Sequence, residues 1–189
     1  MFIHHRQETE VRLSCKHWRA RAPALHKMPN PTLAAKYKYR RRLPHLQKDD
    51  ADLFVTFCTA GRQPLPGNAR DLVLQHCLRE NNQRIQLHAA VVMPDHVHLL
   101  FRVLRNDDGW TYSLIEIMQC MKGATAHQIN KLIGTSGPVW EEESFDHVLR
   151  SDESSKEKAQ YIKQNPVRAG LVQKPEDHRW LWVNPEFKF

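Results

Sequence analysis

The sequence predicts an α+β fold of the ferredoxin-like, split βαβ type, with a four-stranded antiparallel sheet, helices on one face, and a further C-terminal helix. Two observations lead to this prediction. Segments rich in β-forming residues and segments with helical periodicity follow one another in the order strand, helix, strand, strand, helix, strand. The two middle strands are separated only by Met93-Pro94-Asp95, which predicts a hairpin. The helices of this fold would leave the other sheet face open.

The first half of the chain supplies a strand, a loop and a helix. Residues 53–59 are rich in Phe, Val and Thr, which favour a strand. Residues 61–67 hold two glycines and two prolines and predict a loop. Asn68 is the expected N-cap of a helix that runs to about Asn81 on a mixed apolar stripe.

The hairpin strands are predicted over 85–92 and 95–103, and a polar loop over 105–110 follows them. Ser113 is then the expected cap of a long helix over 114–133, because apolar residues recur there at helical spacing. Two lysines of this helix, Lys122 and Lys131, fall mostly away from the apolar stripe. They are either contacts to a DNA backbone or part of a solvated helix face.

The fourth strand is predicted over 138–150, with a bulge in 141–144. Ser151 then caps a last helix, which we expect to end at Asn165 because a proline disfavours the helical conformation of the residue before it. Residues 175–189 carry Trp180 and Trp182 and predict a tail that packs its tryptophans on the domain.

Composition agrees with one globular domain of 189 residues, with 41% hydrophobic residues. No apolar run approaches the roughly 20 residues that span a bilayer, and the basic N-terminus lacks the apolar middle of a signal peptide. A cytoplasmic protein without membrane attachment is therefore expected. The four cysteines are widely spaced and fit reduced thiols better than disulfides or a zinc site.

The net charge of +7, from 28 Lys and Arg against 21 Asp and Glu, favours a polyanionic partner such as DNA or RNA. The chain divides into a basic arm over 1–42, a folded domain over 43–182 and a tail over 183–189. The arm contains a basic run interleaved with tyrosines, which are candidates for phosphate contacts and base stacking. These residues are Tyr37, Tyr39, Arg40, Arg41 and Arg42. A solvated leader is the alternative.

Side chains alternate along a strand, so His96 and His98 share one sheet face while Val97 and Leu99 share the other, core face. Two imidazoles held on a rigid strand suit a divalent metal ion. The alternative is a pair of half-exposed surface histidines.

A second polar pair lies in the last helix. Tyr161 and Asn165 are four residues apart and face the same way. A phenolate is a nucleophile that can hold a DNA phosphate covalently, and an amide oxygen can serve as a third metal ligand. The alternatives are a half-buried helix tyrosine and a helix C-cap.

Two segments closely resemble the motifs of the REP-associated tyrosine transposases, single-tyrosine members of the HUH nuclease superfamily related to the IS200-like transposases. The segments are Met93-Pro94-Asp95-His96-Val97-His98-Leu99-Leu100 and Tyr161-Ile162-x-x-Asn165-Pro166-Val167-Arg168-Ala169-Gly170-Leu171-Val172. Other positions are also similar to that family: Trp140, Phe145-Asp146, Leu149-Arg150, and Pro44-His45 with Phe54-Val55-Thr56-Phe57. The resemblance covers roughly residues 43–182.

Carried over by position, the resemblance implies that His96 and His98 bind the metal and that Tyr161 is the nucleophile. Asn165 stands where relatives place a third polar ligand, with Gln164 as the fallback. Asp95 stands where many members have Asn. The last helix would then be the catalytic helix, and its Lys163 and Arg168 are further candidates for DNA contacts.

The implied activity is Mg²⁺- or Mn²⁺-dependent cleavage and rejoining of a DNA strand through a 5′-phosphotyrosine. The implied substrate is single-stranded or hairpin DNA at palindromic repeats of a bacterial chromosome, which implies a nucleoid-associated bacterial protein. A homodimer that exchanges the catalytic helix and a monomer are both compatible with the sequence. Two other functions stay open: a non-cleaving regulator that binds hairpin DNA or RNA, and a metal hydrolase that uses water.

Overall fold

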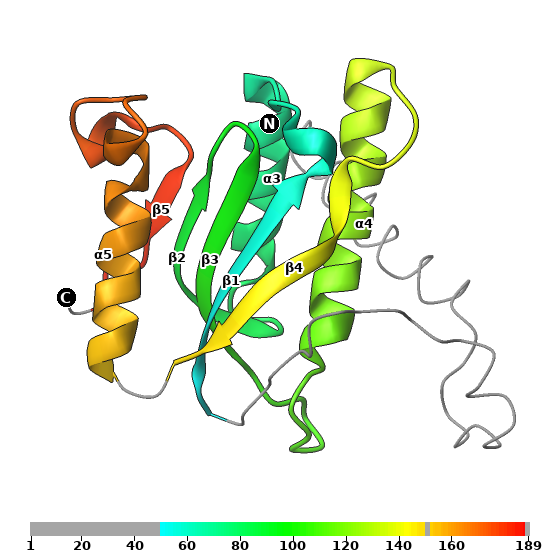
Figure 1. Cartoon of the computed structure of the whole chain (residues 1–189). Coiled ribbons are helices and arrows are strands. Elements are labelled where there is room, and N and C mark those ends of the chain that lie inside the picture. The colour runs from blue at the N-terminus through cyan, green and yellow to red at the C-terminus, as the bar shows by residue number, and fades with distance from the viewer. Residues whose placement is uncertain (1–49, 150–151, 188–189) are drawn as a thin grey trace, which may run out of the picture. The chain divides into compact units, whose positions relative to one another are not determined.

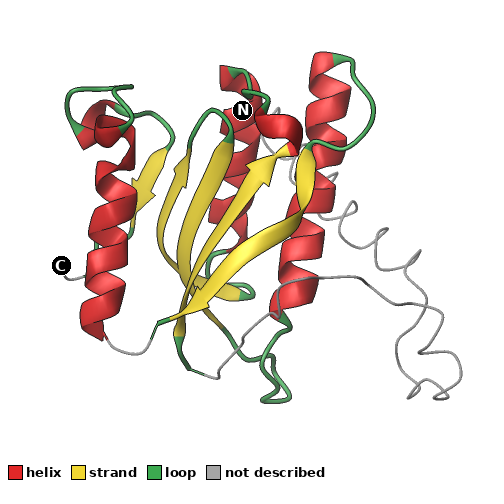
Figure 2. Ribbon diagram, in the orientation of Figure 1, coloured by secondary structure: helices red, strands yellow, loops and turns green. Residues whose placement is uncertain are grey.

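The computed structural model describes residues 50–149 and 152–187. Within these ranges, five strands form one antiparallel sheet in the order β4-β1-β3-β2-β5 (Figures 1 and 2). The strands are β1 (Asp52–Thr59), β2 (Ile85–Val92), β3 (His96–Val103), β4 (Trp140–Val148) and β5 (Leu181–Val183). The helices are α3 (Gly67–Glu80), α4 (Leu114–Ile133) and α5 (Asp152–Arg168), with 3₁₀ turns η1 (Ala60–Arg62) and η2 (Pro175–Asp177).

The α+β class and the antiparallel sheet are confirmed, but the prediction of four strands was wrong. The fifth strand, β5, pairs with β2 at the edge of the sheet, where Trp182 lies opposite Ala90. Three residues are too few to show an alternating pattern in the sequence. The edge of β2 offers unpaired backbone groups that such a segment satisfies. The packing of Trp180 and Trp182 against the core is confirmed.

Helices α3 and α4 lie on one face of the sheet and α5 on the other (Figure 1), and each face has its own apolar cluster. On one face, Val97, Leu99 and Phe101 of β3 pack with residues of α3 and α4. On the other face, Leu100 of β3 packs with Ala159 and Ile162 of α5. The face that also carries His98 is therefore not left open, contrary to the prediction, because the apolar stripe of α5 is buried against it.

Helix α4 has the predicted bounds and the predicted N-cap, and a glycine ends it. The side chain of Ser113 accepts a hydrogen bond from the backbone N–H of Glu116, and Gly134 adopts the left-handed conformation, with φ of 67°, that ends many helices. Helix α3 begins two residues earlier than expected, with Pro66 rather than Asn68 at its N-cap. The bulge predicted in 141–144 is confirmed by a register shift opposite Phe57 and Thr59.

Helix α5 passes through Pro166 and ends at Arg168, so the predicted end at Asn165 was wrong. Proline lacks an N–H and costs about 3 kcal/mol in a helix interior. Here it lies in the last turn, where only one ladder bond is lost. The N–H of Ala169 still bonds the carbonyl of Asn165 at 2.9 Å, and the N–H of Leu171 bonds the carbonyl of Pro166 at 2.9 Å. The extra turn brings Arg168 onto the helix.

No helix in the described ranges is long and apolar enough to cross a membrane.

A buried histidine of α3 predicts a loss of stability in mild acid. His76 is 2% exposed, and its Nε2 has no hydrogen-bond partner and lies 3.7 Å from Glu80 Oε1. Burial lowers the pKa of His76 to about 4, although Glu80 opposes this shift. An unfolded chain, with a histidine pKa near 6.5, binds more protons between pH 6.5 and 4. The free energy of unfolding should therefore fall as pH drops through this window.

We expect His76 to contribute about 2 kcal/mol of the stability lost between pH 7 and pH 5. Urea unfolding of His76→Leu at the two pH values should show a loss smaller by that amount than in the wild type. His127→Leu, at an exposed position of α4, is the matched control and should behave as the wild type. Equal losses in all three proteins would contradict the prediction.

Candidate active site

The two histidines of β3 lie on the same face, as predicted, with ring centroids 4.7 Å apart. Strand β1 places its own side chains beside them, since Thr56 pairs with His98 and Cys58 with His96 across the antiparallel ladder. Residues directly opposite on neighbouring strands point to the same face. The sheet thus holds the imidazoles between two central strands rather than on a loop.

His96 is oriented by its sequence neighbour. Its Nδ1 lies 2.7 Å from Asp95 Oδ1, and Arg62 donates to the other carboxylate oxygen at 3.2 Å. Burial would raise the pKa of Asp95, but these bonds lower it, so the group is a carboxylate. A carboxylate only accepts hydrogen bonds, so Nδ1 of His96 is the donor and Nε2 is the ring nitrogen left for a further ligand. The negative charge of Asp95 strengthens this orientation.

His98 is oriented by a side chain of the neighbouring strand. Its Nδ1 lies 2.7 Å from Thr56 Oγ1. The ring is 6% exposed, and burial, with His96 and Lys158 nearby, lowers the pKa of His98 to about 3. The neutral ring can donate from Nδ1 to the hydroxyl and keep its Nε2 lone pair, as metal-binding histidines do. Within the described residues, neither Nε2 atom has a hydrogen-bond partner.

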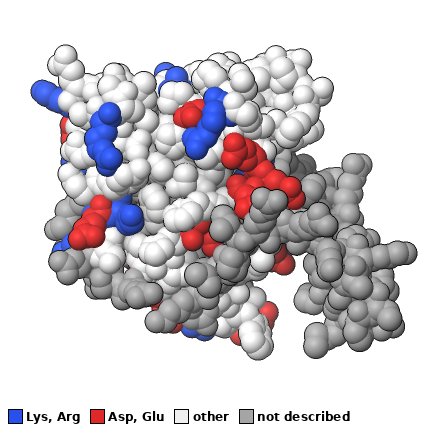
Figure 3. Space-filling model, viewed as in Figure 1, with Lys and Arg blue, Asp and Glu red and all other residues white. Residues whose placement is uncertain are grey.

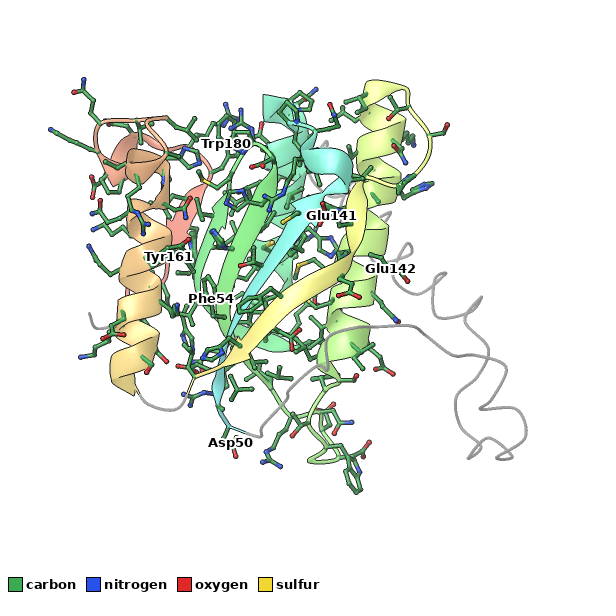
Figure 4. All side chains as sticks on the ribbon, viewed as in Figure 1. Asp50, Phe54, Glu141, Glu142, Tyr161 and Trp180 are labelled. Atoms are coloured by element: carbon green, nitrogen blue, oxygen red, sulfur yellow. The ribbon has the colours of Figure 1, made fainter. Side chains whose placement is uncertain are left out.

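Tyr161 lies against this pair although it is 63 residues beyond His98 in the chain. Its ring centroid is 5.4 Å from that of His98, with an interplanar angle of 70°, and 5.9 Å from that of Phe54 on β1. The buried side of α5 is formed by Ala159 and Ile162, and Tyr161 lies on the adjoining stripe. Figure 4 shows the tyrosine on the side of α5 that faces the sheet. The predicted convergence of phenol and imidazoles is present.

A polar stripe runs along α5 through Lys158, Tyr161, Asn165 and Arg168, spaced by three, four and three residues. Arg168 Cζ is 4.9 Å from the Tyr161 ring centroid. Lys158 Nζ is 5.7 Å from that centroid and 5.0 Å from the centroid of Phe54. Sequence reasoning missed Lys158, although its spacing of three residues from Tyr161 was a usable signal.

The residues at this site suit a metal ion with a mixed ligand set. No group of three or more His, Cys, Asp and Glu side chains in the described residues is arranged to hold a metal. The candidate protein ligands at this site are the two Nε2 atoms and an amide oxygen from α5. Asn165 lies about 40° around the helix from Tyr161 and Gln164 about 60° on the other side, so the two amides are about 100° apart. The metal-binding roles of His96, His98 and Asn165 stay predictions.

The other candidates for DNA contacts do not gather at this site. Lys122 donates to the Glu142 carbonyl at 2.8 Å, and Lys131 is exposed near the end of the same helix, α4, across the sheet from α5. Lys163 pairs with Glu176 at 3.5 Å. The five candidates of the N-terminal arm, Tyr37, Tyr39, Arg40, Arg41 and Arg42, lie outside the described residues.

Charge is unevenly distributed on the face that carries α5 and β4. Figure 3 shows basic side chains over α5 and a group of acidic side chains over β4. Glu141, Glu142 and Glu143 form that acidic run. A polyanion that approaches this face would be attracted toward α5 and repelled from β4.

Comparisons with known proteins agree with this architecture. The family model described as Transposase IS200 like matches residues 49–165, which is more than half of the chain. A protein of Haemophilus influenzae that carries the name REP-associated tyrosine transposase is 27% identical over 94 residues, which cover 47% of this chain and 53% of the relative. The chain thus spans about half of the length of that relative.

A solved structure, described as a REP-associated tyrosine transposase bound to a REP hairpin, has a similar fold. Its TM-score is 0.60 at 16% sequence identity, and the match covers 79% of this chain and 94% of that one. At this identity the similarity supports a shared fold and not a shared substrate. The family match agrees with the resemblance seen in the sequence motifs, and this chain belongs to the IS200-like transposase family.

Proposed function

We propose that this protein cleaves and rejoins a DNA strand at hairpin DNA, with Tyr161 as the nucleophile. The observation that carries the proposal is the contact of the Tyr161 ring with His98, at 5.4 Å between centroids, from two elements distant in sequence. A half-buried structural tyrosine would not need two oriented imidazoles beside it. Hairpin DNA is proposed as the substrate because the solved relative with a similar fold is bound to a REP hairpin.

The proposed reaction is a phosphoryl transfer without net consumption of protons or energy. The phenol oxygen of Tyr161 attacks the scissile phosphorus, the new oxygen–phosphorus bond forms, and the bond from phosphorus to the 3′ oxygen breaks. The phenol gives up its proton and the departing 3′ oxygen gains one, which leaves a 5′-phosphotyrosine and a 3′-hydroxyl. Attack by a 3′-hydroxyl on the phosphotyrosine reverses these changes, so no ATP is needed.

We further propose that His96, His98 and Asn165 hold one Mg²⁺ or Mn²⁺ ion. Such an ion supplies charge that polarises a phosphate oxygen. The protein contributes the orientation of its ligands. Asp95 and Thr56 lie 2.7 Å from the Nδ1 atoms, which leaves both Nε2 atoms to bind the ion. In other metal sites, loss of such supporting hydrogen bonds typically lowers metal affinity or activity by about 10- to 100-fold.

The test is a labelled hairpin oligonucleotide with a single-stranded flank, incubated with the protein and Mg²⁺ or Mn²⁺. We expect a covalent protein–DNA adduct that is lost on addition of EDTA. His96→Ala should lower the adduct yield at least about 100-fold. His127→Ala, on α4, is the matched control and should react as the wild type.

Two results would contradict the proposal. Cleavage to free 5′ ends, with no protein attached, would identify water as the nucleophile and a hydrolase as the function. Tight hairpin binding without cleavage in either metal would identify a non-cleaving, hairpin-binding regulator descended from such transposases.

A further inference from the structure

Two basic side chains flank Tyr161 along α5, and neither is neutralised in the described residues. Lys158 lies one turn before the tyrosine and Arg168 two turns after it. Among residues 50–149 and 154–187, whose side chains the structure describes, no carboxylate forms an ion pair with either one. In contrast, Lys163 on a different side of the helix pairs with Glu176, and Arg62 pairs with Asp95. The charges of Lys158 and Arg168 are therefore available to an anion.

Both cations are held at the tyrosine by aromatic contacts. Lys158 Nζ lies near two rings, 5.0 Å from the Phe54 centroid and 5.7 Å from the Tyr161 centroid. Arg168 Cζ lies 4.9 Å from the centroid of Tyr161. Contacts of this kind fix a cation while its N–H groups remain able to donate to a ligand. Lys158 is half-buried, so its charge is less screened than that of a fully exposed lysine.

We propose that Lys158 and Arg168 form an anion site that binds phosphates of the DNA strand on either side of the phosphate that reacts with Tyr161. This inference rests on the proposed function and names the residues that position the strand for it. The spacing of the three side chains along α5 lays the backbone of the strand along the helix, with the reacting phosphate at Tyr161.

The chemistry fits the two residue types. Arg168 offers a planar fork of N–H donors that matches two phosphate oxygens, and Lys158 offers a compact point charge on a flexible stem. When the flanking phosphates are held, the reacting phosphorus lies in line with the phenol oxygen. Such positioning is a main contribution of the protein to phosphoryl transfer. Lys158 and Arg168 are therefore positioning residues rather than nucleophiles or acids.

The alternative is purely structural: Lys158 would serve only to attach α5 to the sheet through Phe54. The two roles differ in their dependence on DNA charge. A structural lysine affects thermal stability and does not change the salt dependence of binding. A phosphate contact changes the slope of log Kd against log salt by about 0.7 to 1.

The test uses the Tyr161→Phe protein without added metal, so that binding is measured where no cleavage is possible. We expect Lys158→Met to weaken binding of a hairpin with a single-stranded flank about fivefold and to reduce the salt slope by about 0.7. Lys158→Arg should restore most of the affinity. Lys156→Met is the matched control, because Lys156 is exposed on the opposite side of α5. It should change binding less than about twofold.

A second measurement locates the contact. Neutral methylphosphonate linkages are placed one at a time in the single-stranded flank. At one flanking position, Lys158→Met should no longer weaken binding, because the charge that Lys158 contacts has been removed. A different position should show this behaviour for Arg168→Gln.

The inference is overturned if Lys158→Met binds with the affinity and salt slope of Lys156→Met, or if its loss of affinity is the same for every methylphosphonate position. Neither measurement depends on an adduct. A protein that binds as expected and forms no adduct would refute the proposed cleavage and leave the anion site in place.

Discussion

Tyr161→Phe is expected to abolish the covalent adduct, with at least a 1,000-fold loss of cleavage rate at saturating hairpin DNA, about the size seen when a nucleophile is removed. The substitution deletes one oxygen atom and keeps the ring. The ring contacts with His98 and Phe54, at 5.4 and 5.9 Å between centroids, should therefore remain. Thermal stability should be unchanged, and hairpin binding should stay within about twofold, since the phenol oxygen is not the main source of affinity.

Tyr112→Phe is the matched control for this experiment. Tyr112 also lies partly buried against the core, but it is on the α3 and α4 side of the sheet. It should form the adduct at the wild-type rate. An adduct that persists in Tyr161→Phe would refute the assignment of the nucleophile, and mass spectrometry of the labelled peptide would identify the residue that reacts instead.

Asp52→Ala is expected to cause the largest loss of stability, about 3 kcal/mol in the free energy of unfolding. Asp52 is 6% exposed and accepts hydrogen bonds from three elements. Ser155 Oγ of α5 donates at 2.7 Å, Arg102 Nε of β3 at 2.9 Å, and His88 Nε2 of β2 lies 3.2 Å away. Removal of the carboxylate leaves these polar groups without their shared acceptor. Ser155 lies fewer than two turns before Tyr161, so α5 should also be loosened.

The ionised form of Asp52 carries this stability. Burial would raise the pKa of Asp52, but the hydrogen bonds from His88, Ser155 and Arg102 hold it well below its usual range. A depressed folded-state pKa contributes stability that is complete above the unfolded pKa of about 3.9 and is lost as pH falls further. The cost of Asp52→Ala should therefore be constant between pH 5 and 8, which urea unfolding across that range would measure.

Asp71→Ala is the control for Asp52→Ala. Asp71 accepts comparable bonds, from Arg179 at 2.9 Å and Trp180 Nε1 at 2.8 Å, but at a more exposed position. Exposed ion pairs contribute little, so its loss should cost about 1 kcal/mol or less. If both substitutions lower the free energy of unfolding equally, the buried hydrogen bonds of Asp52 do not stabilise the packing of α5 on the sheet.

Local pattern was enough to predict most elements and the sharing of one face by His96 and His98. The two-residue period of a strand places them without reference to any other part of the chain. The caps of α4 were equally local, since Ser113 and Gly134 act within one turn of the helix ends. The four-residue spacing of Tyr161 and Asn165 depends only on helical geometry.

The helical conformation of Pro166 was missed for a local reason: the N–H groups of Ala169 and Leu171 supply other hydrogen bonds in the last turn of α5. Other features depended on contacts between distant segments. The three-residue β5 exists because β2 provides an edge for it. Thr56 became part of the site through strand register, since it lies opposite His98 only when β1 and β3 are paired.

The sequence by itself determined the strand that presents two imidazoles, the helix that presents a phenol, and the family to which both motifs belong, because each depends on periodicity within one segment or on motif identity. Only the tertiary structure decided that α5 covers the histidine face, that Asp52 joins this helix to three strands, and that Lys158 lies over Phe54 of β1. The placement of α5 depends on which side of the helix is buried. Apolar partners and buried hydrogen bonds from segments up to about 100 residues away in the chain determine that side.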